Sequence, residues 1–311
     1  MELLSQYGLF LLKTLTVVIA FLVMFAGIFS MSRKPKPKLE IHSLNEQYEH
    51  INSLMSKEVL GEKVKKSKKS KEKKPKLYLL EFKGDIKASQ VEQLREEVSS
   101  ILTVAQPQDE VVIRIESPGG SVNGYGLAAA QLQRIRDKNI PLTACIDKVA
   151  ASGGYLMACV ANKIIAAPFA IIGSIGVVAQ IPNFHRWLKK NNIDIELLTA
   201  GEYKRTLTLF GENTDKDREK FQEDLEKIHT AFRQYVLSNR SQLNIDEVST
   251  GEHWLAKDAF DLHLVDVLQT SDDYLISNMN KFKAFKLSAH TKESLINKVL
   301  RPAMNLMHPW A

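Results

Sequence analysis

Two patterns of apolar and polar residues alternate along residues 77–268. Short runs of consecutive apolar residues, which are typical of buried strands, cover residues 77–86, 111–117, 141–147, 163–168, 173–180 and 193–200. Between them, apolar residues recur at helical spacing over residues 89–102, 122–137, 151–161 and 184–191. Strands that are apolar throughout and separated by helices predict a largely parallel sheet covered by helices.

From Thr214 onwards helical spacing dominates, and the pattern predicts a region that is almost wholly helical. Its longest element is a charged helix over residues 215–239, with Thr214 and Asp215 as candidate N-terminal caps. The expected fold class is therefore α/β, with a helical carboxyl-terminal region.

The amino-terminal segment has a different pattern. Residues 14–32, between Lys13 and Arg33, are 19 uncharged residues, and a helix of that length covers about 28 Å, close to the apolar thickness of a bilayer. A cleaved signal peptide would have a shorter apolar run that ends in a small-x-small site, whereas this run ends in IFSMS. The prediction is an uncleaved single-pass anchor over residues 1–32. A cleaved signal peptide and a buried soluble helix remain as alternatives.

Residues 33–76 are expected to form a basic, largely disordered linker. Nine lysines lie within Lys63–Lys76 with almost no apolar side chain, so this run cannot offset the loss of chain entropy by burial. A weakly helical stretch is expected over residues 39–60. The expected parts are thus the anchor (1–32), the linker (33–76) and an α/β domain (77–311).

Positive charge is concentrated in the first two parts. Residues 1–76 hold 15 Lys and Arg against 7 Asp and Glu, which leaves 27 against 29 for the remainder. Nucleic acid is not expected as a partner, because a phosphate footprint should lie on the folded surface. The lysine run is interpreted as a solvated tether, with contact to anionic lipid headgroups as the alternative.

Segments of small residues interrupt the apolar pattern at strand ends. In the first, SPGGS over residues 117–121, Gly119 and Gly120 either let bare backbone N–H groups approach a ligand or form an ordinary tight turn. In the second, Ser152 and Gly153 begin a predicted helix. The serine suits a nucleophile on a sharp turn and a helix N-cap equally well.

A third such segment is GSIG over residues 173–176, inside an otherwise apolar run. Its glycines permit close backbone approach around Ser174, or a structural bulge. A lysine at a predicted strand end, Lys204 in AGEYKR, follows these three segments.

These motifs, in this order, resemble the signal peptide peptidase A family of membrane serine peptidases, and most closely its SohB branch. The resemblance covers about residues 77–268. It rests on SPGGSV, DKVAASGGYLMACVANKIIAAPFAIIGSIGV, GEYK and TGEHWLAKDAFDLHLVDVL. The single-pass anchor also fits this family, whereas the lysine-rich linker looks like a local feature of this chain.

The resemblance implies a Ser/Lys dyad on a fold similar to the Clp protease and crotonase group, with its repeated ββα units. By position in the motifs, Ser152 would be the nucleophile and Lys204 its general base, and Ser174 would hold the lysine amine in place. Gly119 or Gly120, together with the N–H of Gly153, would form the oxyanion hole.

The chemistry of these residue types agrees with that assignment. A serine hydroxyl is a weak nucleophile unless a neighbouring base takes its proton. Lysine is such a base only as a neutral amine, which burial favours. Leu207, Leu209 and Phe210, close to the lysine in sequence, would supply apolar surroundings.

Other catalytic patterns are not favoured. The eight histidines fall in the linker, in the tail, or on predicted helices and surface turns, which argues against a Ser/His/Asp triad. HExxH and CxxC spacings are absent, as is GxSxG around Ser152, which disfavours metal catalysis and an α/β-hydrolase. No cofactor and no metal are expected. Two other functions stay open: a catalytically inactive membrane scaffold of the same fold, and a crotonase-like enzyme acting on acyl-CoA.

Substrate and location follow from the anchor and from the resemblance. A peptidase tethered beside a bilayer meets membrane-derived peptides, so the expected substrates are short hydrophobic or unfolded peptides such as remnant signal peptides. The resemblance implies the periplasmic face of the cell inner membrane. The basic SRKPKPK that follows the anchor favours the cytoplasmic face instead, by the positive-inside rule.

The resemblance also implies a homo-oligomeric ring, in which the serine and the lysine can come from neighbouring subunits; their pairing within one chain stays open. Four apolar residues in a region dense in charge are candidates for the contact between subunits: Phe210, Phe221, Phe232 and Tyr235. Packing within one subunit is their alternative role.

Overall fold

The structure is a computed structural model that describes residues 2–32, 38–61 and 74–290. The chain divides into two compact units. One unit contains residues 40–288, and the other contains residues 1–39 and 289–311. Each is described by itself.

The amino-terminal unit contains one long helix, α1 (Glu2–Ser32), so the apolar run over residues 14–32 is helical. Thr14 and Thr16 donate their hydroxyl hydrogens to the carbonyl oxygens of Phe10 and Leu12, at 2.9 and 2.6 Å. Those bonds within the helix satisfy the hydroxyl groups that interrupt its apolar surface. Among the described residues, no helix is both long and apolar enough to cross a membrane.

A seven-stranded sheet forms the centre of the larger unit, in the order β1-β10-β2-β3-β4-β6-β9. The pairs from β10 to β9 are all parallel. The strands of this sheet are β1 (Lys38–Ser43), β2 (Lys76–Lys83), β3 (Glu110–Glu116), β4 (Leu142–Ile146), β6 (Lys163–Ala166), β9 (Val267–Leu268) and β10 (Lys283–His290). The predicted α/β class and the largely parallel sheet are confirmed, and four predicted strands correspond to β2, β3, β4 and β6.

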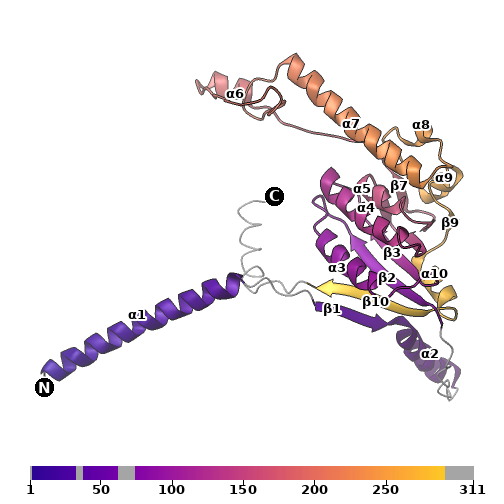
Figure 1. The fold of residues 1–311 in the computed structure, drawn as a ribbon, viewed down its shortest axis with the longest axis horizontal. Helices are drawn as coiled ribbons and strands as arrows, with labels where there is room; N and C mark the ends of the chain where they lie inside the picture. The colour runs from indigo at the N-terminus through magenta and orange to yellow at the C-terminus, as the bar shows by residue number, and fades with distance from the viewer. Residues whose placement is uncertain (1, 33–37, 62–73, 291–311) are drawn as a thin grey trace. The chain divides into compact units, whose positions relative to one another are not determined.

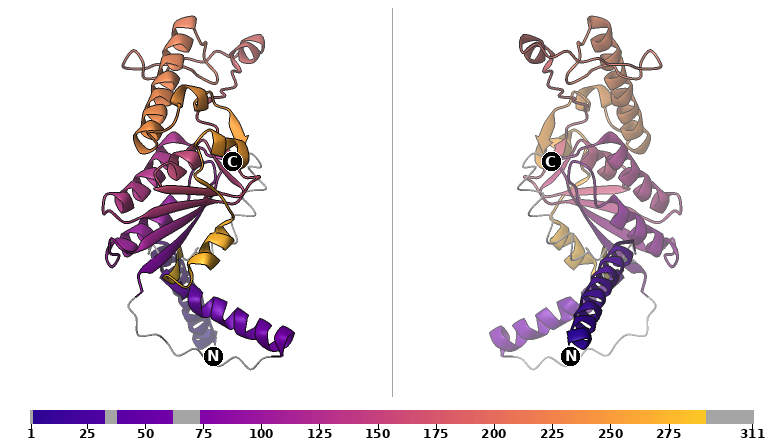
Figure 2. Two further views of the ribbon diagram at one scale, coloured as in Figure 1. Left: turned by 90° about the vertical axis from the view of Figure 1, so that its right-hand side faces the viewer. Right: turned by 90° about the vertical axis from the view of Figure 1, so that its left-hand side faces the viewer.

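Helices cover both faces of this sheet. Figure 2 shows α3 (Val91–Leu102) and α4 (Val122–Arg136) on one face, and α10 (Ser271–Asn278) on the other. The apolar faces of α3 and α4 are buried, which explains the helical spacing seen in the sequence. A second, three-stranded sheet consists of β5 (Val149–Ala151), β7 (Ile171–Gly173) and β8 (His253–Leu255), and α5 (Gly153–Ala158) follows β5 directly.

The remaining helices are α2 (Leu44–Leu60), α6 (His185–Lys190), α7 (Asp215–Asn239), α8 (Ile245–Val248) and α9 (Ala256–Asp261). The predicted helix over residues 215–239 is confirmed, and of the two candidate caps Thr214 is the N-cap. Its hydroxyl accepts the N–H of Asp217 at 3.2 Å, and the Asp217 carboxylate accepts the N–H of Thr214 at 2.9 Å. This capping box satisfies two amides that the helix leaves without partners.

Two expected strands are wrong. The run over residues 173–180 leaves the small sheet after Gly173, and residues 193–200 contain no strand. Residues 193–200 are exposed and pair with no described strand. Their apolar residues therefore form neither a sheet nor part of the core.

The prediction that the chain is almost wholly helical after Thr214 is also wrong. Three strands, β8, β9 and β10, follow in that region. β8 and β9 are three and two residues long, too short for a period of two to be recognised. β10 lies between β1 and β2, so its position depends on pairing with segments far away in sequence.

The segment expected to be a linker contains β1 and α2, and α2 covers most of the weakly helical stretch. Asn45 fixes the start of α2 to the turn before β10: its amide donates to the carbonyl oxygens of Met279 and Phe282, and its side-chain oxygen accepts the N–H of Ala284 at 2.7 Å. Leu44 is buried in the same core cluster as Leu77. Residues 62–73, which include most of the lysine run, lie outside the described residues.

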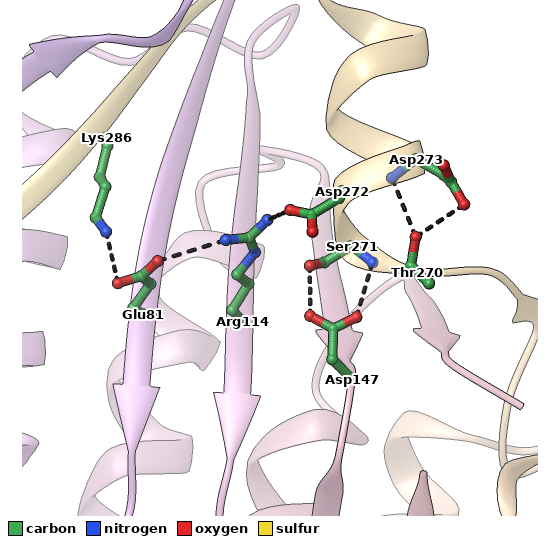
Figure 3. A network of polar contacts seen from close by, with 8 residues as sticks. All are labelled: Glu81, Arg114, Asp147, Thr270, Ser271, Asp272, Asp273 and Lys286. Atoms are coloured by element: carbon green, nitrogen blue, oxygen red, sulfur yellow. Dashed lines mark hydrogen bonds and ion pairs between the residues drawn. The ribbon is translucent and has the colours of Figure 1, made fainter. Parts of the chain in front are cut away.

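A polar network joins strands that are far apart in sequence (Figure 3). Glu81 on β2 bonds Lys286 on β10 at 2.7 Å and lies 3.6 Å from Arg114 on β3. Arg114 also pairs with Asp272 in the first turn of α10. Together these contacts connect β10 and α10 to the centre of the sheet.

Asp147 holds the start of α10 from a different direction (Figure 3). Its carboxylate accepts the backbone N–H of Ser271 at 2.8 Å and the Ser271 hydroxyl at 2.5 Å. Thr270 is the N-cap of α10 and accepts the N–H of Asp273 at 3.2 Å. The start of α10 is thus fixed both by its own N-cap, Thr270, and by Asp147 from a distant part of the chain.

A buried ion pair fixes the end of α7. The guanidinium of Arg240, whose side chain is 4% exposed, donates to both carboxylate oxygens of Asp266, at 2.7 and 2.8 Å, and to the carbonyl oxygen of His263. Asp266 also accepts the N–H of Ile164 at 2.7 Å. One carboxylate therefore joins α7 to β6 and to the segment before β9.

Asp266→Asn is expected to lower the free energy of unfolding by about 3 kcal/mol, because the buried guanidinium loses its counter-charge. For a domain of this size, that corresponds to a fall in Tm of roughly 6–12 °C, which thermal unfolding of the purified chain measures. Asp224→Asn is the matched control, since the Asp224 carboxylate, which pairs with Lys220 on α7, is 47% exposed, and it should leave Tm almost unchanged. Equal shifts for both variants would contradict a special role for the buried pair.

Candidate functional site

A cavity of about 1100 Å³ brings the three small-residue segments together. Its walls contain Gly119 and Gly120 from the first segment, Ser152 and Gly153 from the second, and Ser174 from the third. Residues of α4, α5 and α7 and of the loops around residues 86, 177 and 250 also contribute to the lining. Segments up to 55 positions apart in sequence therefore meet in one place.

Ser152 lies on a sharp turn between β5 and α5. Its backbone has φ 51° and ψ −118°, a conformation that residues with a side chain rarely adopt, and which therefore has an energetic cost. Its N–H donates to the carbonyl oxygen of Gly173 at 2.7 Å, which helps to hold that conformation. The Ser152 hydroxyl makes no capping bond to α5. Ser152 is therefore the N-cap residue of α5 by position, while its hydroxyl is left free for another role.

Gly119 approaches Ser152 more closely than any other residue type would allow. A Cβ atom on Gly119 would lie 2.7 Å from the Cβ of Ser152 and 2.8 Å from the backbone nitrogen of Gly153, and the φ of Gly119 is +92°. Gly119 therefore serves close backbone contact with the serine turn, and Gly120 makes an equally close contact with the backbone of Ile86. An ordinary tight turn does not account for the pair.

The backbone amides around Ser152 differ in their partners. The N–H of Gly119 donates to the hydroxyl oxygen of Ser117 at 3.1 Å. Within the described part of the chain, the amides of Gly120 and Gly153 have no hydrogen-bond acceptor. One unpaired amide thus lies in each of the two segments that adjoin the serine, and of the two glycines named for the oxyanion hole, Gly120 is the one whose amide is free.

Ser174 lies just after β7, also with a positive φ, 54°. Its N–H donates to the carbonyl oxygen of Glu252 at 2.5 Å. A Cβ on Gly176 would lie 2.9 Å from the Cα of Gly251, so the backbones of these two segments touch. The third small-residue segment is the end of a strand packed closely against residues 251–252.

His229 on α7 lines the same cavity, although no sequence motif singles it out. Its Nε2 lies 2.9 Å from the carbonyl oxygen of Ser249 and 3.3 Å from that of Ile175. Because both partners are acceptors, Nε2 carries a hydrogen and donates it. This nitrogen is therefore not available to take a proton from Ser152. Its role is to join α7 to the segment that carries Ser174.

Lys204 does not line the cavity. It is exposed, in a segment that contacts the first turns of α7: Lys216 bonds Glu202 at 2.8 Å, and the ring of Tyr203 lies beneath the ammonium groups of Lys216 and Lys220. Figures 1 and 2 show α6 and the loops around it next to the amino-terminal part of α7, away from the sheet. Within one chain, Ser152 and Lys204 are not brought together.

The apolar residues expected around the lysine are themselves partly exposed. Leu209 and Phe210 are 43% and 48% exposed. Phe210 stacks on Phe184, with 6.1 Å between ring centroids. Of the other aromatic residues named for contact between subunits, Phe232 and Tyr235 line the cavity of the same chain.

The two cysteines are not candidates for the nucleophile. Cys145 and Cys159 are both buried, and burial raises the pKa of each thiol to about 12. At neutral pH neither is a thiolate, the form of cysteine that attacks carbonyl carbon. Ser152 is therefore the candidate nucleophile at this cavity.

Comparison with known proteins agrees with the motifs. Residues 134–285 match the model of peptidase family S49, and residues 2–132 match the model of its N-terminal region. "Probable protease SohB" of Haemophilus influenzae is 45% identical over 341 aligned positions, which cover 100% of this chain and 97% of that protein. "Probable protease SohB" of Buchnera aphidicola subsp. Schlechtendalia chinensis is 50% identical over 304 positions, 89% of this chain and 100% of that protein.

A more distant relative matches a smaller part. "Protease 4" of Haemophilus influenzae is 29% identical over 158 positions, which cover 50% of this chain and 26% of that protein. The full-length matches and the two family models carry the assignment. The chain belongs to peptidase family S49 and is a serine-type peptidase of the SohB type.

Proposed function

We propose that this chain is a membrane-anchored endopeptidase that cleaves short hydrophobic or unfolded peptides with a Ser/Lys dyad. The observation that carries the proposal is the environment of Ser152. Its hydroxyl is not used by the helix that follows, and it lies between segments that each hold an unpaired amide, in a cavity of about 1100 Å³.

In the proposed reaction, the Ser152 hydroxyl oxygen attacks the carbonyl carbon of the substrate peptide while the general base takes its proton. The carbonyl oxygen becomes an oxyanion and accepts the N–H groups of Gly120 and Gly153, which are already in position before the reaction. Collapse of the tetrahedral intermediate expels the amine, which receives the proton. Water then hydrolyses the acyl-enzyme by the same sequence of steps.

The lining of the cavity supports an apolar substrate. Side chains of Val122, Leu156, Leu225, Ile228 and Phe232 contribute to its walls. Within the described residues, the lining contains no lysine and no arginine, so the phosphates of an acyl-CoA would meet no cation there. The lack of cations in the described lining favours a peptide over an acyl-CoA, the substrate of the alternative crotonase-like enzyme.

The general base of the proposed dyad is Lys204, supplied by a neighbouring subunit of a homo-oligomeric ring. A lysine that acts as a base must lose its contact with water, yet Lys204 is exposed in a single chain. The segment around it also exposes large apolar side chains, such as Trp187 at 63% and Leu198 at 90%. Contact with a second copy would bury these side chains and the lysine together.

The proposed anchor is the uncharged segment over residues 14–32. Its support is the length of the segment. The catalytic domain is proposed to face the periplasm, as the family resemblance implies.

Ser152→Ala and Lys204→Ala are each expected to reduce hydrolysis of a short apolar peptide to background. Removal of one member of a catalytic unit costs about as much as removal of all of it, on the order of a millionfold in one well-measured serine protease. Ser241→Ala and Lys257→Ala, at exposed positions outside the cavity, are the matched controls. A fluorophosphonate probe should label the wild type and not Ser152→Ala. Retention of more than a few per cent of activity in either variant contradicts the dyad.

Mixed subunits test whether the site is shared. After subunit exchange, equal amounts of Ser152→Ala and Lys204→Ala chains should recover up to about a quarter of wild-type activity, because one interface in four of a closed ring then joins an intact serine to an intact lysine. Ser152→Ala mixed with the double variant is the control and should recover nothing. No recovery after confirmed exchange would place both residues in one chain.

Deletion of residues 1–32 is expected to move the protein from the membrane pellet to the soluble fraction. Washing with 1 M salt separates two causes, because salt screens attraction of the lysine run to anionic lipid but does not weaken an apolar anchor. Release of the full-length chain by salt alone would contradict the anchor. Protection of the catalytic domain from external protease in spheroplasts would contradict the periplasmic face.

A further inference from the structure

A chain of hydrogen bonds lies beneath the glycine turn of the site, and the proposed mechanism does not use it. The hydroxyl oxygens of Ser117 and Tyr125 are 2.5 Å apart, and the Tyr125 hydroxyl lies 2.9 Å from the carbonyl oxygen of Asp85. Ser117 and Tyr125 are both fully buried. Burial raises the pKa of Tyr125, so its hydroxyl keeps its proton at neutral pH.

The partners fix the direction of every bond in this chain. The carbonyl oxygen of Asp85 only accepts, so the single proton of the Tyr125 hydroxyl is donated to it. The hydroxyl of Ser117 must then donate to the oxygen of Tyr125. That leaves the Ser117 oxygen free to accept the N–H of Gly119, at 3.1 Å. The order is Gly119 to Ser117 to Tyr125 to Asp85, with each proton used once.

This chain determines which amide of the glycine turn is free. Because the N–H of Gly119 is held by Ser117, the peptide plane before Gly119 is fixed, and the next amide, that of Gly120, is the unpaired one. The other side of the turn is also held, since the N–H of Ser121 donates to the carbonyl oxygen of Ile86 at 2.8 Å. Both sides of the turn are thus attached to the segment that follows β2.

The ring of Tyr125 supports the second amide. A Cβ atom on Gly153 would lie 2.3 Å from the Cγ of Tyr125, so the ring packs directly against the backbone of the residue after Ser152. A Cβ on Gly84 would lie 2.2 Å from the Tyr125 hydroxyl, so the far end of this side chain is also closely packed against backbone. Tyr125 therefore contacts the backbone of Gly153, which supplies one donor. Through Ser117 it also fixes the glycine turn, in which Gly120 supplies the other donor.

We propose that Tyr125, acting with Ser117, is a positioning residue that fixes the geometry of the oxyanion hole formed by Gly120 and Gly153. The proposal rests on the proposed function of that site. An oxyanion hole stabilises the transition state only if its donors are placed before charge develops. Displacement of the donors by even about 1 Å is costly. The hydroxyl of Tyr125 supplies part of that placement through its bonds to Ser117 and to the carbonyl oxygen of Asp85.

Tyr125→Phe tests the proposal, because it keeps the ring and removes only the hydroxyl. The expected result is a 10- to 100-fold fall in kcat for hydrolysis of an apolar peptide, with KM within twofold of wild type, since loss of one oxyanion donor outright costs about 10²–10³ in kcat. Rates are counted per active Ser152, titrated with a fluorophosphonate, so that loss of folded protein does not count as loss of catalysis. Affinity for a peptide aldehyde, which forms a tetrahedral adduct at the serine, should fall by the same factor as kcat/KM.

Tyr155→Phe is the matched control. Tyr155 is also fully buried and also donates to a backbone carbonyl, that of Leu264 at 3.1 Å, but it does not line the cavity. This variant should lose a comparable amount of stability and keep kcat per active serine within twofold. A similar fall in kcat for both tyrosine variants would mean that loss of a buried hydroxyl is enough, and would overturn the proposal.

Ser117→Ala decides the question if Tyr125→Phe does not fold. It removes the acceptor for Gly119 and should lower kcat in the same direction. Where both variants fold, the double variant should be no slower than the slower single one, because both changes break one chain of bonds. Wild-type kcat in the folded variants, with Ser152 still required, overturns the positioning role alone. Hydrolysis that does not require Ser152 overturns the proposed function instead.

Discussion

The close approach of the Gly119 backbone to Ser152 is the constraint on which the rest of the site depends. Two backbone bonds produce it: the N–H of Ser117 donates to Val149 at 2.9 Å, and the N–H of Ala151 donates to Ser117 at 3.0 Å. They attach the end of β3 in the large sheet to β5 in the small sheet. The backbones of Gly119 and of the serine turn then meet with no room for a Cβ atom on Gly119, which is why a glycine is needed there.

Two strained residues line the same cavity. Ser152 and Ser174 both have positive φ, 51° and 54°, and each costs on the order of 1–3 kcal/mol. The carbonyl of Gly173, directly before Ser174, accepts the N–H of Ser152, and the carbonyl of Glu252 accepts the N–H of Ser174. Ser152 is thus held by the residue before Ser174, and Ser174 is held by the residue before β8. Both backbone conformations therefore depend on bonds to the ends of strands in the small sheet.

The sequence predicts those parts of the fold that depend on local pattern. Buried strands such as β3, and capped helices such as α7, leave a clear period or a capping residue. β10 does not, because it pairs with β2 through register positions such as Lys283 with Lys76, more than 200 residues apart. The run over residues 193–200 shows the opposite case: its apolar residues suggest a strand, but none of the described strands pairs with it.

The site is predictable to a similar extent. Small residues at strand ends mark the serine and the glycine turn, because close backbone contact restricts residue type. Tyr125 leaves no such mark: a buried tyrosine on an amphipathic helix looks like any core residue until its hydroxyl is followed to Ser117. His229 is not predicted for the same reason: its partners are backbone carbonyl oxygens, and any residue type can supply these, so they leave no pattern in the sequence. Polar side chains that act through backbone atoms are therefore the part of a catalytic site that sequence motifs reveal least. They are recognised only when hydrogen-bond donors and acceptors are followed in the structure.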